Sequence, residues 1–182
     1  KLKQILHLTR QVLPFLEKIY AGQDEPLLID AGAGKAYFGF VLCDLLCRPF
    51  AKGQVMCIES RAELVAQCRE LAEQMKLGAR MQFHQGVIAD TSGLTRPPDL
   101  VCALHACDTA TDDAILLGLK SQATHFALVP CCQAEVAQAL KDLPKENLWP
   151  LWRHPIQGRE FGSHLTNVIR CLVLESRGYK VH

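Results

Sequence analysis

Five short strand-like runs, four of them mainly apolar, alternate along this chain with segments of helical spacing, and this alternation limits the fold more than any other feature. The apolar runs are PLLID (26–30), QVMCIE (54–59), DLVCAL (99–104) and HFALVP (125–130), and the more polar one is MQFHQ (81–85). Near-continuous apolar strands separated by helices are typical of a parallel sheet covered on both faces. Because crossovers between parallel strands are right-handed, the sequence predicts an α/β, doubly wound, mostly parallel sheet of the Rossmann-like kind.

The segments between these runs have the apolar period of helices. Residues 2–19 carry one apolar stripe, and residues 37–47 and 64–75 are predicted helices as well. Near the end, apolar positions in 164–177 predict a helix, with Ser163 placed to cap it and Gly178 placed to end it. The segment 152–167 lacks a clean period and is interpreted as an insertion before that helix, while YKV (179–181) is expected to open another strand.

Length and composition indicate one domain, with residues 1–22 as an N-terminal helix and residues 23–182 as the core. No apolar run reaches the length of a membrane span and no signal peptide opens the chain, so we expect a cytoplasmic protein without a membrane partner. The formal charge of +1 argues against a strongly basic nucleic-acid binder. Because the chain lacks an initiator Met and a closing antiparallel strand, we expect residues to be missing at both ends.

The cysteine pattern indicates buried thiols rather than a metal site. The chain has nine cysteines, but no pair has the CxxC spacing of a zinc site and the CxxxCxxC pattern of radical chemistry is absent. Cys57, Cys102 and Cys171 lie in apolar runs, and Cys43 and Cys47 are at helical spacing. We therefore expect no bound metal and a reducing compartment.

The strongest local signal is LLIDAGAGKAYFG, in which small residues let the backbone turn tightly off the first strand and approach a ligand. Either a dinucleotide or S-adenosylmethionine could occupy such a turn, and a turn that is tight only for packing is the alternative. Asp30 stands at the strand tip before Gly32 and Gly34, where an acid would repel a pyrophosphate and favour the amino-acid end of S-adenosylmethionine. Glu59, at the end of the second strand, is placed to accept hydrogen bonds from a ribose diol of either ligand.

Four motifs together resemble the class I S-adenosylmethionine-dependent methyltransferases: IDAGAGKAYFG, IES, ALHACDTATD and VPCCQ. They are similar to the branch that includes the tRNA acceptor-stem ribose 2′-O-methyltransferases, and the resemblance covers roughly residues 24–182. In the tRNA enzymes a histidine follows the two cysteines, where this chain has Gln133. The resemblance implies S-adenosyl-L-methionine as cofactor. It would be held by Asp30, Gly32 and Gly34 at the methionine end, by Glu59 at the ribose, by Gly86, Val87 and Ile88 around the adenine, and by Leu104.

Reactive side chains follow the fourth and fifth strands, at the sheet edge where doubly wound folds bind ligands. His105 is a candidate base and Asp108 a candidate orienting or acceptor-binding group; a loop hydrogen bond and a helix cap are the alternative roles. Cys131 could attack a substrate, or pack as a small residue beside Cys132 while Gln133 contacts the acceptor. The insertion could supply Arg159 to phosphates and Phe161 to stacked bases, or be an ordinary surface loop.

The preferred hypothesis is direct methyl transfer from S-adenosylmethionine to a nucleophile on RNA, either tRNA or rRNA. A catalytically idle module that binds the cofactor or recruits a partner is the first alternative. A small-molecule methyltransferase is another, and a nicotinamide-dependent oxidoreductase is a further one. The acceptor atom and the oligomeric state stay open at this point.

Overall fold

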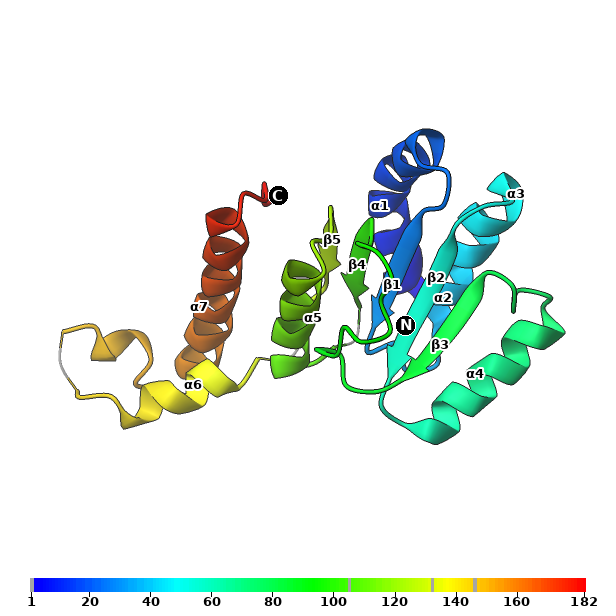
Figure 1. Cartoon of the computed structure of the whole chain (residues 1–182). Helices are drawn as coiled ribbons and strands as arrows, with labels where there is room; N and C mark the ends of the chain where they lie inside the picture. The colour runs from blue at the N-terminus through cyan, green and yellow to red at the C-terminus, as the bar shows by residue number, and fades with distance from the viewer. Residues whose placement is uncertain (1, 105, 132, 146) are drawn as a thin grey trace.

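The computed structural model describes residues 2–104, 106–131, 133–145 and 147–182. Its centre is one all-parallel sheet with the strand order β3-β2-β1-β4-β5 (Figure 1). The strands are β1 (Leu27–Ala31), β2 (Gln54–Glu59), β3 (Met81–Gln85), β4 (Leu100–Ala103) and β5 (Phe126–Leu128). The order reverses between β1 and β4, and this is where doubly wound sheets open a crevice for ligands. The predicted α/β fold class is confirmed.

Helices cover both faces of the sheet. On one face α1 (Leu2–Gly22) and the continuous helical run α2 (Tyr37–Leu42), η1 (Cys43–Cys47) and α3 (Arg48–Phe50) pack over alternate residues of β1, β2 and β4. Cys68 and Ala72 of α4 (Ala62–Gln74) belong to the same apolar cluster. On the other face α5 (Thr109–Lys120) places Ala114 and Leu117 over the opposite side chains of the strands. Adjacent strand residues therefore serve two separate cores, as a pleated strand requires.

The sequence located each of the five strands, and two of them to the residue. The predicted bounds of β2 and β3 are those observed, while β1, β4 and β5 differ by one or two residues at their ends. The helices predicted for 2–19, 37–47 and 64–75 are present as α1, the α2–η1 run and α4. Within the part of the chain that the structure describes, no helix is long and apolar enough to cross a membrane.

Two predictions near the end of the chain are wrong. The insertion ahead of the last helix is itself helical, because α7 spans Pro155–Ser176 with Pro155 in its first turn, so Ser163 lies inside the helix rather than at its cap. The strand expected at 179–181 is not formed. Instead the ring of Tyr179 packs edge-on against Phe126 with centroids 5.0 Å apart, and its hydroxyl donates to the carbonyl of Ala123. The expected helix end at Gly178 is confirmed, with φ +87°.

The helical segments that follow β5 form a lobe beside the sheet (Figure 1). Between β5 and α7 lie α6 (Glu135–Ala139), η2 (Leu140–Asp142) and η3 (Trp149–Leu151). A Cβ on Gly162 of α7 would lie 2.6 Å from the Cα of Ala137, so a glycine is needed where α6 and α7 cross. In Figure 1, α6 and the first turns of α7 lie at the end of the sheet where the strands finish. This arrangement brings the lobe to the same side of the molecule as the strand-end residues.

Candidate functional site

The glycine turn between β1 and α2 is built around left-handed backbone. Gly32 has φ +69° and Gly34 has φ +59°, conformations that glycine adopts without a Cβ clash. A Cβ on Gly32 would lie 3.2 Å from Ile88 Cδ1 and 3.5 Å from Ala106 Cβ. The turn therefore meets the loop after β3 and the segment after β4 in one small region, as expected of a site at the switch point of the sheet.

Glu59, the last residue of β2, is tied to this turn. Its Oε2 accepts a hydrogen bond of 2.8 Å from the backbone N–H of Gly34, and the N–H of Ala33 donates to the carbonyl of Ile58 at 2.9 Å. The Glu59 carboxylate also accepts three bonds from Arg61, from its backbone N–H, Nε and Nη2. The Arg61 guanidinium, together with these backbone donors, lowers the pKa of Glu59 to about 2 against the opposing effect of burial. The acid expected at the ribose position is ionised and fixed in place.

Asp30 is buried beneath the glycine turn. Its Oδ2 accepts a bond of 3.1 Å from the backbone N–H of Gly39 in α2, and only 3% of the residue is exposed. Burial raises the pKa of Asp30 to about 7, because the one backbone donor offsets only part of the loss of water. The carboxyl group thus joins β1 to the helix that follows the turn.

The remaining residues proposed for the cofactor border the same region. The N–H of Gly86 donates to the carbonyl of Glu59 at 3.2 Å, which fixes the loop after β3 to the end of β2. Val87 is exposed, Ile88 is half-buried against the turn, and Leu104 is buried. All eight candidate cofactor residues therefore lie on four neighbouring segments, each at the end of a strand where parallel sheets bind ligands.

The clusters after β4 and β5 are adjacent. The sulfur atoms of Cys107 and Cys131 lie 3.1 Å apart, and both residues are exposed. Asp108 is the N-cap residue of α5 but makes no side-chain cap bond; its Oδ1 instead accepts from the N–H of Ala134 at 3.1 Å. Its backbone has φ 52° and ψ −126°, a conformation that costs a non-glycine residue about 1–3 kcal/mol. The proposed base His105 and Cys132 lie outside the described residues.

The residues proposed for the acceptor are held by the lobe. Gln133 donates through Nε2 to Asn167 and accepts through Oε1 from the hydroxyl of Ser163, so its amide is bonded to α7. Phe161 stacks on Trp152, with ring centroids 5.6 Å apart and planes at 22°. Arg159 lies exposed on the same helix. Arg159 and Phe161 thus lie on α7 and Gln133 is bonded to it, but Gln133 and Phe161 already have partners within the lobe.

Two arginines that bond to groups of the candidate site were not predicted from the sequence. Arg170 of α7 forms a forked ion pair with Asp112 of α5, at 2.7 and 2.8 Å, and donates to the carbonyl of Asp108 at 2.9 Å. These bonds join the lobe to the strand-end cluster. The other is Arg61, which pairs with Glu59. The sequence did contain a signal for it, because Arg61 stands two residues after a predicted ligand-binding acid and has the opposite charge.

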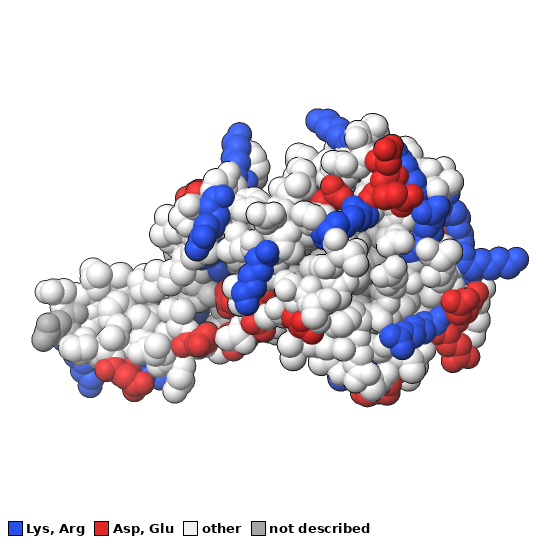
Figure 2. Space-filling model, in the orientation of Figure 1, with Lys and Arg blue, Asp and Glu red and all other residues white. Residues whose placement is uncertain are grey.

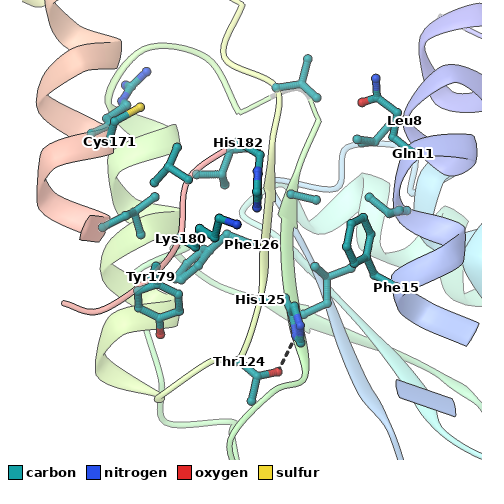
Figure 3. Close-up of a pocket in the computed structure, with 18 of the residues that line it drawn as sticks. Leu8, Gln11, Phe15, Thr124, His125, Phe126, Cys171, Tyr179, Lys180 and His182 are labelled. Carbon is teal, nitrogen blue, oxygen red and sulfur yellow. Dashed lines mark hydrogen bonds between the residues drawn. The ribbon is translucent and has the colours of Figure 1, made fainter. Parts of the chain in front are cut away.

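Two hollows lie near the lobe. A groove of about 740 Å³ runs along β5, between α1 on one side and α7 with the last residues on the other (Figure 3). Phe15 of α1 and Phe126, Tyr179, Lys180 and His182 line it, while none of the eight candidate cofactor residues is among the described side chains that do so. A second hollow of about 620 Å³ lies between α5 and α6 and is lined by Asp108, Glu135 and Asp142.

Charged side chains of both signs are mixed over the face shown in Figure 2, with acidic groups where the lobe meets the sheet domain. This distribution agrees with a formal charge of +1. It gives no broad basic surface on this face for duplex RNA.

Comparisons with known proteins identify the family of the chain. Residues 1–139 match the family model described as a methyltransferase domain. No curated protein matches the sequence. Similar solved structures include an rRNA methylase from Streptococcus thermophilus, with 11% identity, 68% of this chain and 73% of that chain covered, and a TM-score of 0.47.

Two further similar structures cover less of their own length. A geranyl diphosphate methyltransferase in complex with GPP and sinefungin has 11% identity, with 59% of this chain and 39% of that chain covered and a TM-score of 0.44. A precorrin-6y C5,15-methyltransferase from Geobacter metallireducens has 15% identity, with 54% and 50% covered and a TM-score of 0.44. This chain thus spans half or less of the length of these two proteins. Because the family model covers residues 1–139 of 182, the chain belongs to the methyltransferase domain family.

Proposed function

We propose that this domain transfers a methyl group from S-adenosylmethionine to a nucleophile on RNA. The observation that carries the cofactor assignment is the bond between the N–H of Gly34 and Oε2 of Glu59, which joins the glycine turn to the acid at the end of β2. A nucleoside lying across that bond would meet backbone that has no side chain at Gly32 and a carboxylate able to accept from its ribose.

The residues present fit such a cofactor. Any Cβ on Gly32 would fill the space in front of Ile88 and Ala106, so the cradle needs glycine there. Glu59 would hold the ribose, Gly32 and Gly34 would receive the methionine end, and Val87 and Ile88 would flank the adenine. When bound, S-adenosylmethionine supplies an electrophilic methyl group on a sulfonium. Asp30 would keep the turn in shape from beneath, through Gly39.

An RNA acceptor is supported by a cluster of aromatic and basic side chains in the lobe. The cluster consists of Lys145, Trp149, Trp152, Arg153 and Phe161. Lys145 and Arg153 lie 5.8 and 6.0 Å from the ring centroid of Trp149, and Trp152 stacks with Phe161. Aromatic rings interleaved with cations are the usual surface for unpaired bases and phosphates. The mixed charge of the face shown in Figure 2 favours a single-stranded or looped acceptor over a long duplex.

Titration calorimetry tests the cofactor. S-Adenosylmethionine should bind the native chain with micromolar affinity, NAD should not, and Glu59→Gln should weaken the binding because an amide accepts fewer hydrogen bonds from a diol. The control is Glu17→Gln on the exposed side of α1, which makes the same change far from the turn. Binding of NAD in place of S-adenosylmethionine would contradict the proposal.

Labelled methyl incorporation tests the acceptor. The full chain is incubated with labelled cofactor and either total small RNA or a mixture of small-molecule acceptors. Label in RNA that decreases in Trp149→Ala supports an RNA methyltransferase. Label only in small molecules would contradict the RNA acceptor, and cofactor binding without label in either pool would favour the idle module. Whether the acceptor is RNA or a small molecule, the proposed location of the enzyme is the reducing cytoplasm.

A further inference from the structure

Arg61 covers the carboxylate that the proposed function assigns to the ribose. Its Nε lies 2.8 Å from Oε1 of Glu59 and its Nη2 lies 3.2 Å from Oε2. The same Nη2 is the nearest atom to the position of a Cβ on Gly34, at 3.8 Å. The guanidinium thus lies over both Glu59 and the second glycine of the turn.

The hydrogen bonds of Glu59 leave little room for another donor. Oε1 accepts from the N–H and Nε of Arg61 and, at 3.4 Å, from the hydroxyl of Ser60. Oε2 accepts from the N–H of Gly34 and from Nη2 of Arg61. A carboxylate offers about four lone-pair positions in all. A ribose diol needs two of them. The backbone holds two and, apart from the long bond from Ser60, the guanidinium uses the other two.

The two partners differ in how easily they can move. The Glu59 side chain is 8% exposed and is anchored by the backbone donors of Gly34 and Arg61. The Arg61 side chain is 58% exposed, so its guanidinium can be transferred to water while the carboxylate stays in place. Water and salt screen the charge of an exposed guanidinium, which weakens its ion pair. Displacement of the arginine is therefore a small cost rather than a barrier.

We infer that Arg61 is an internal competitor for the ribose site, which must leave Glu59 before a nucleoside diol can bind and which thereby sets the affinity of the domain for its cofactor. This inference rests on the proposed function, since it assumes that Glu59 receives the ribose. It assigns to Arg61 a role in specificity, because only a ligand with a diol to offer can replace the two bonds that the guanidinium gives up.

The test compares native chain and Arg61→Ala by calorimetric titration with S-adenosylhomocysteine. Removing the guanidinium should tighten binding about two- to five-fold, the ratio that corresponds to an exposed ion pair. Arg10→Ala, which removes the same side chain from an exposed position on α1, should bind as the native chain does. Thermal unfolding of each variant confirms that the fold is kept.

A second titration isolates the diol. Adenosine should gain affinity in Arg61→Ala, whereas 2′,3′-dideoxyadenosine, which lacks the diol, should bind both forms alike. Weaker or unchanged binding of S-adenosylhomocysteine by Arg61→Ala would overturn the inference and make Arg61 an orienting partner of Glu59. If neither form binds S-adenosylhomocysteine, the proposed function fails and the inference fails with it; binding by both with no gain overturns the inference alone.

Discussion

Oδ2 of Asp30 lies 3.1 Å from the backbone nitrogen of Gly39, in a place where only 3% of the aspartate is exposed. One donor does not replace the water that an ionised carboxylate loses on burial, and burial therefore raises the pKa of Asp30 to about 7. The aspartate lies beneath a turn that the ligand must approach. Its ionisation consequently links the stability of the fold to the shape of the site.

This link gives a pH-dependent prediction. Because the pKa of Asp30 is higher in the folded than in the unfolded chain, the folded state holds the proton between about pH 4 and pH 7. The free energy of unfolding should therefore fall as pH rises through that window, by on the order of 4 kcal/mol, and stay at the lower level above it. Asp30→Asn should remove this contribution and be the more stable form at pH 8, since its amide oxygen can still accept from Gly39.

Urea unfolding of both forms at several values between pH 4 and pH 8 measures the difference. Other groups titrate alike in the two proteins, so the native-minus-variant free energy isolates Asp30. A difference that does not change with pH would show that the carboxyl group is solvated in the fold.

A second prediction concerns the close approach at Gly32. In Gly32→Ala the φ of +69° would cost about 1–2 kcal/mol, and the new methyl group would lie 3.2 Å from Ile88 and 3.5 Å from Ala106. We expect loss of S-adenosylmethionine binding together with this modest loss of stability. Gly22→Ala is the matched control, because a Cβ there meets nothing within 4 Å, and it should bind normally. Calorimetry and urea unfolding report the two effects separately, and full binding by Gly32→Ala would contradict the cradle.

The sequence predicted β1, β2 and β4 well because each is a short apolar run between polar residues, and burial on both faces requires that composition. It did not predict the first two turns of α7. Gly158 and Gly162 weaken the helical pattern there, and Gly162 is required only because α6 crosses at Ala137. A contact between segments far apart in the sequence leaves no periodic pattern in the local sequence that could predict it. YKV has the composition of a strand, but its tyrosine packs against Phe126 instead.

The candidate site was predictable to the same degree. The glycine turn and Glu59 follow from strand-end position, and the structure brings them together through Gly34. The partners of the predicted residues were not predictable, since they depend on which helices meet. Gln133 was expected to face the acceptor, yet its amide bonds to Asn167 and Ser163 of α7. A helix cap was one of the roles open to Asp108, yet its side chain makes no cap bond and accepts from Ala134 instead.

A third prediction tests how the lobe is held. Arg170 is 7% exposed on its side chain and bonds Asp112 through a fork, which a lysine cannot reproduce. Arg170→Lys should weaken the contact between α7 and α5 by about 1.5–3 kcal/mol, the usual contribution of hydrogen bonds to charged groups. Faster amide hydrogen exchange confined to α6 and α7 would show it. Arg177→Lys, exposed at the end of α7, is the control, and equal protection in both variants would mean that apolar packing alone holds the lobe.

The final prediction concerns the sulfur atoms of Cys107 and Cys131, which lie 3.1 Å apart after neighbouring strands. A disulfide bond is about 2.05 Å long, so a movement of about 1 Å would join them. Mild oxidation with diamide should do so: the two thiols lose two protons and two electrons, and the reagent takes both up as its hydrazine form. Because Cys132 is the next residue, the experiment uses a Cys132→Ser background, and peptide mass spectrometry under non-reducing conditions identifies the linked pair. Cys107→Ser should abolish the link and Cys171→Ser should leave it. A link from Cys131 to any other cysteine, or no link at all, would mean that the two strand ends are not held as close as the structure has them.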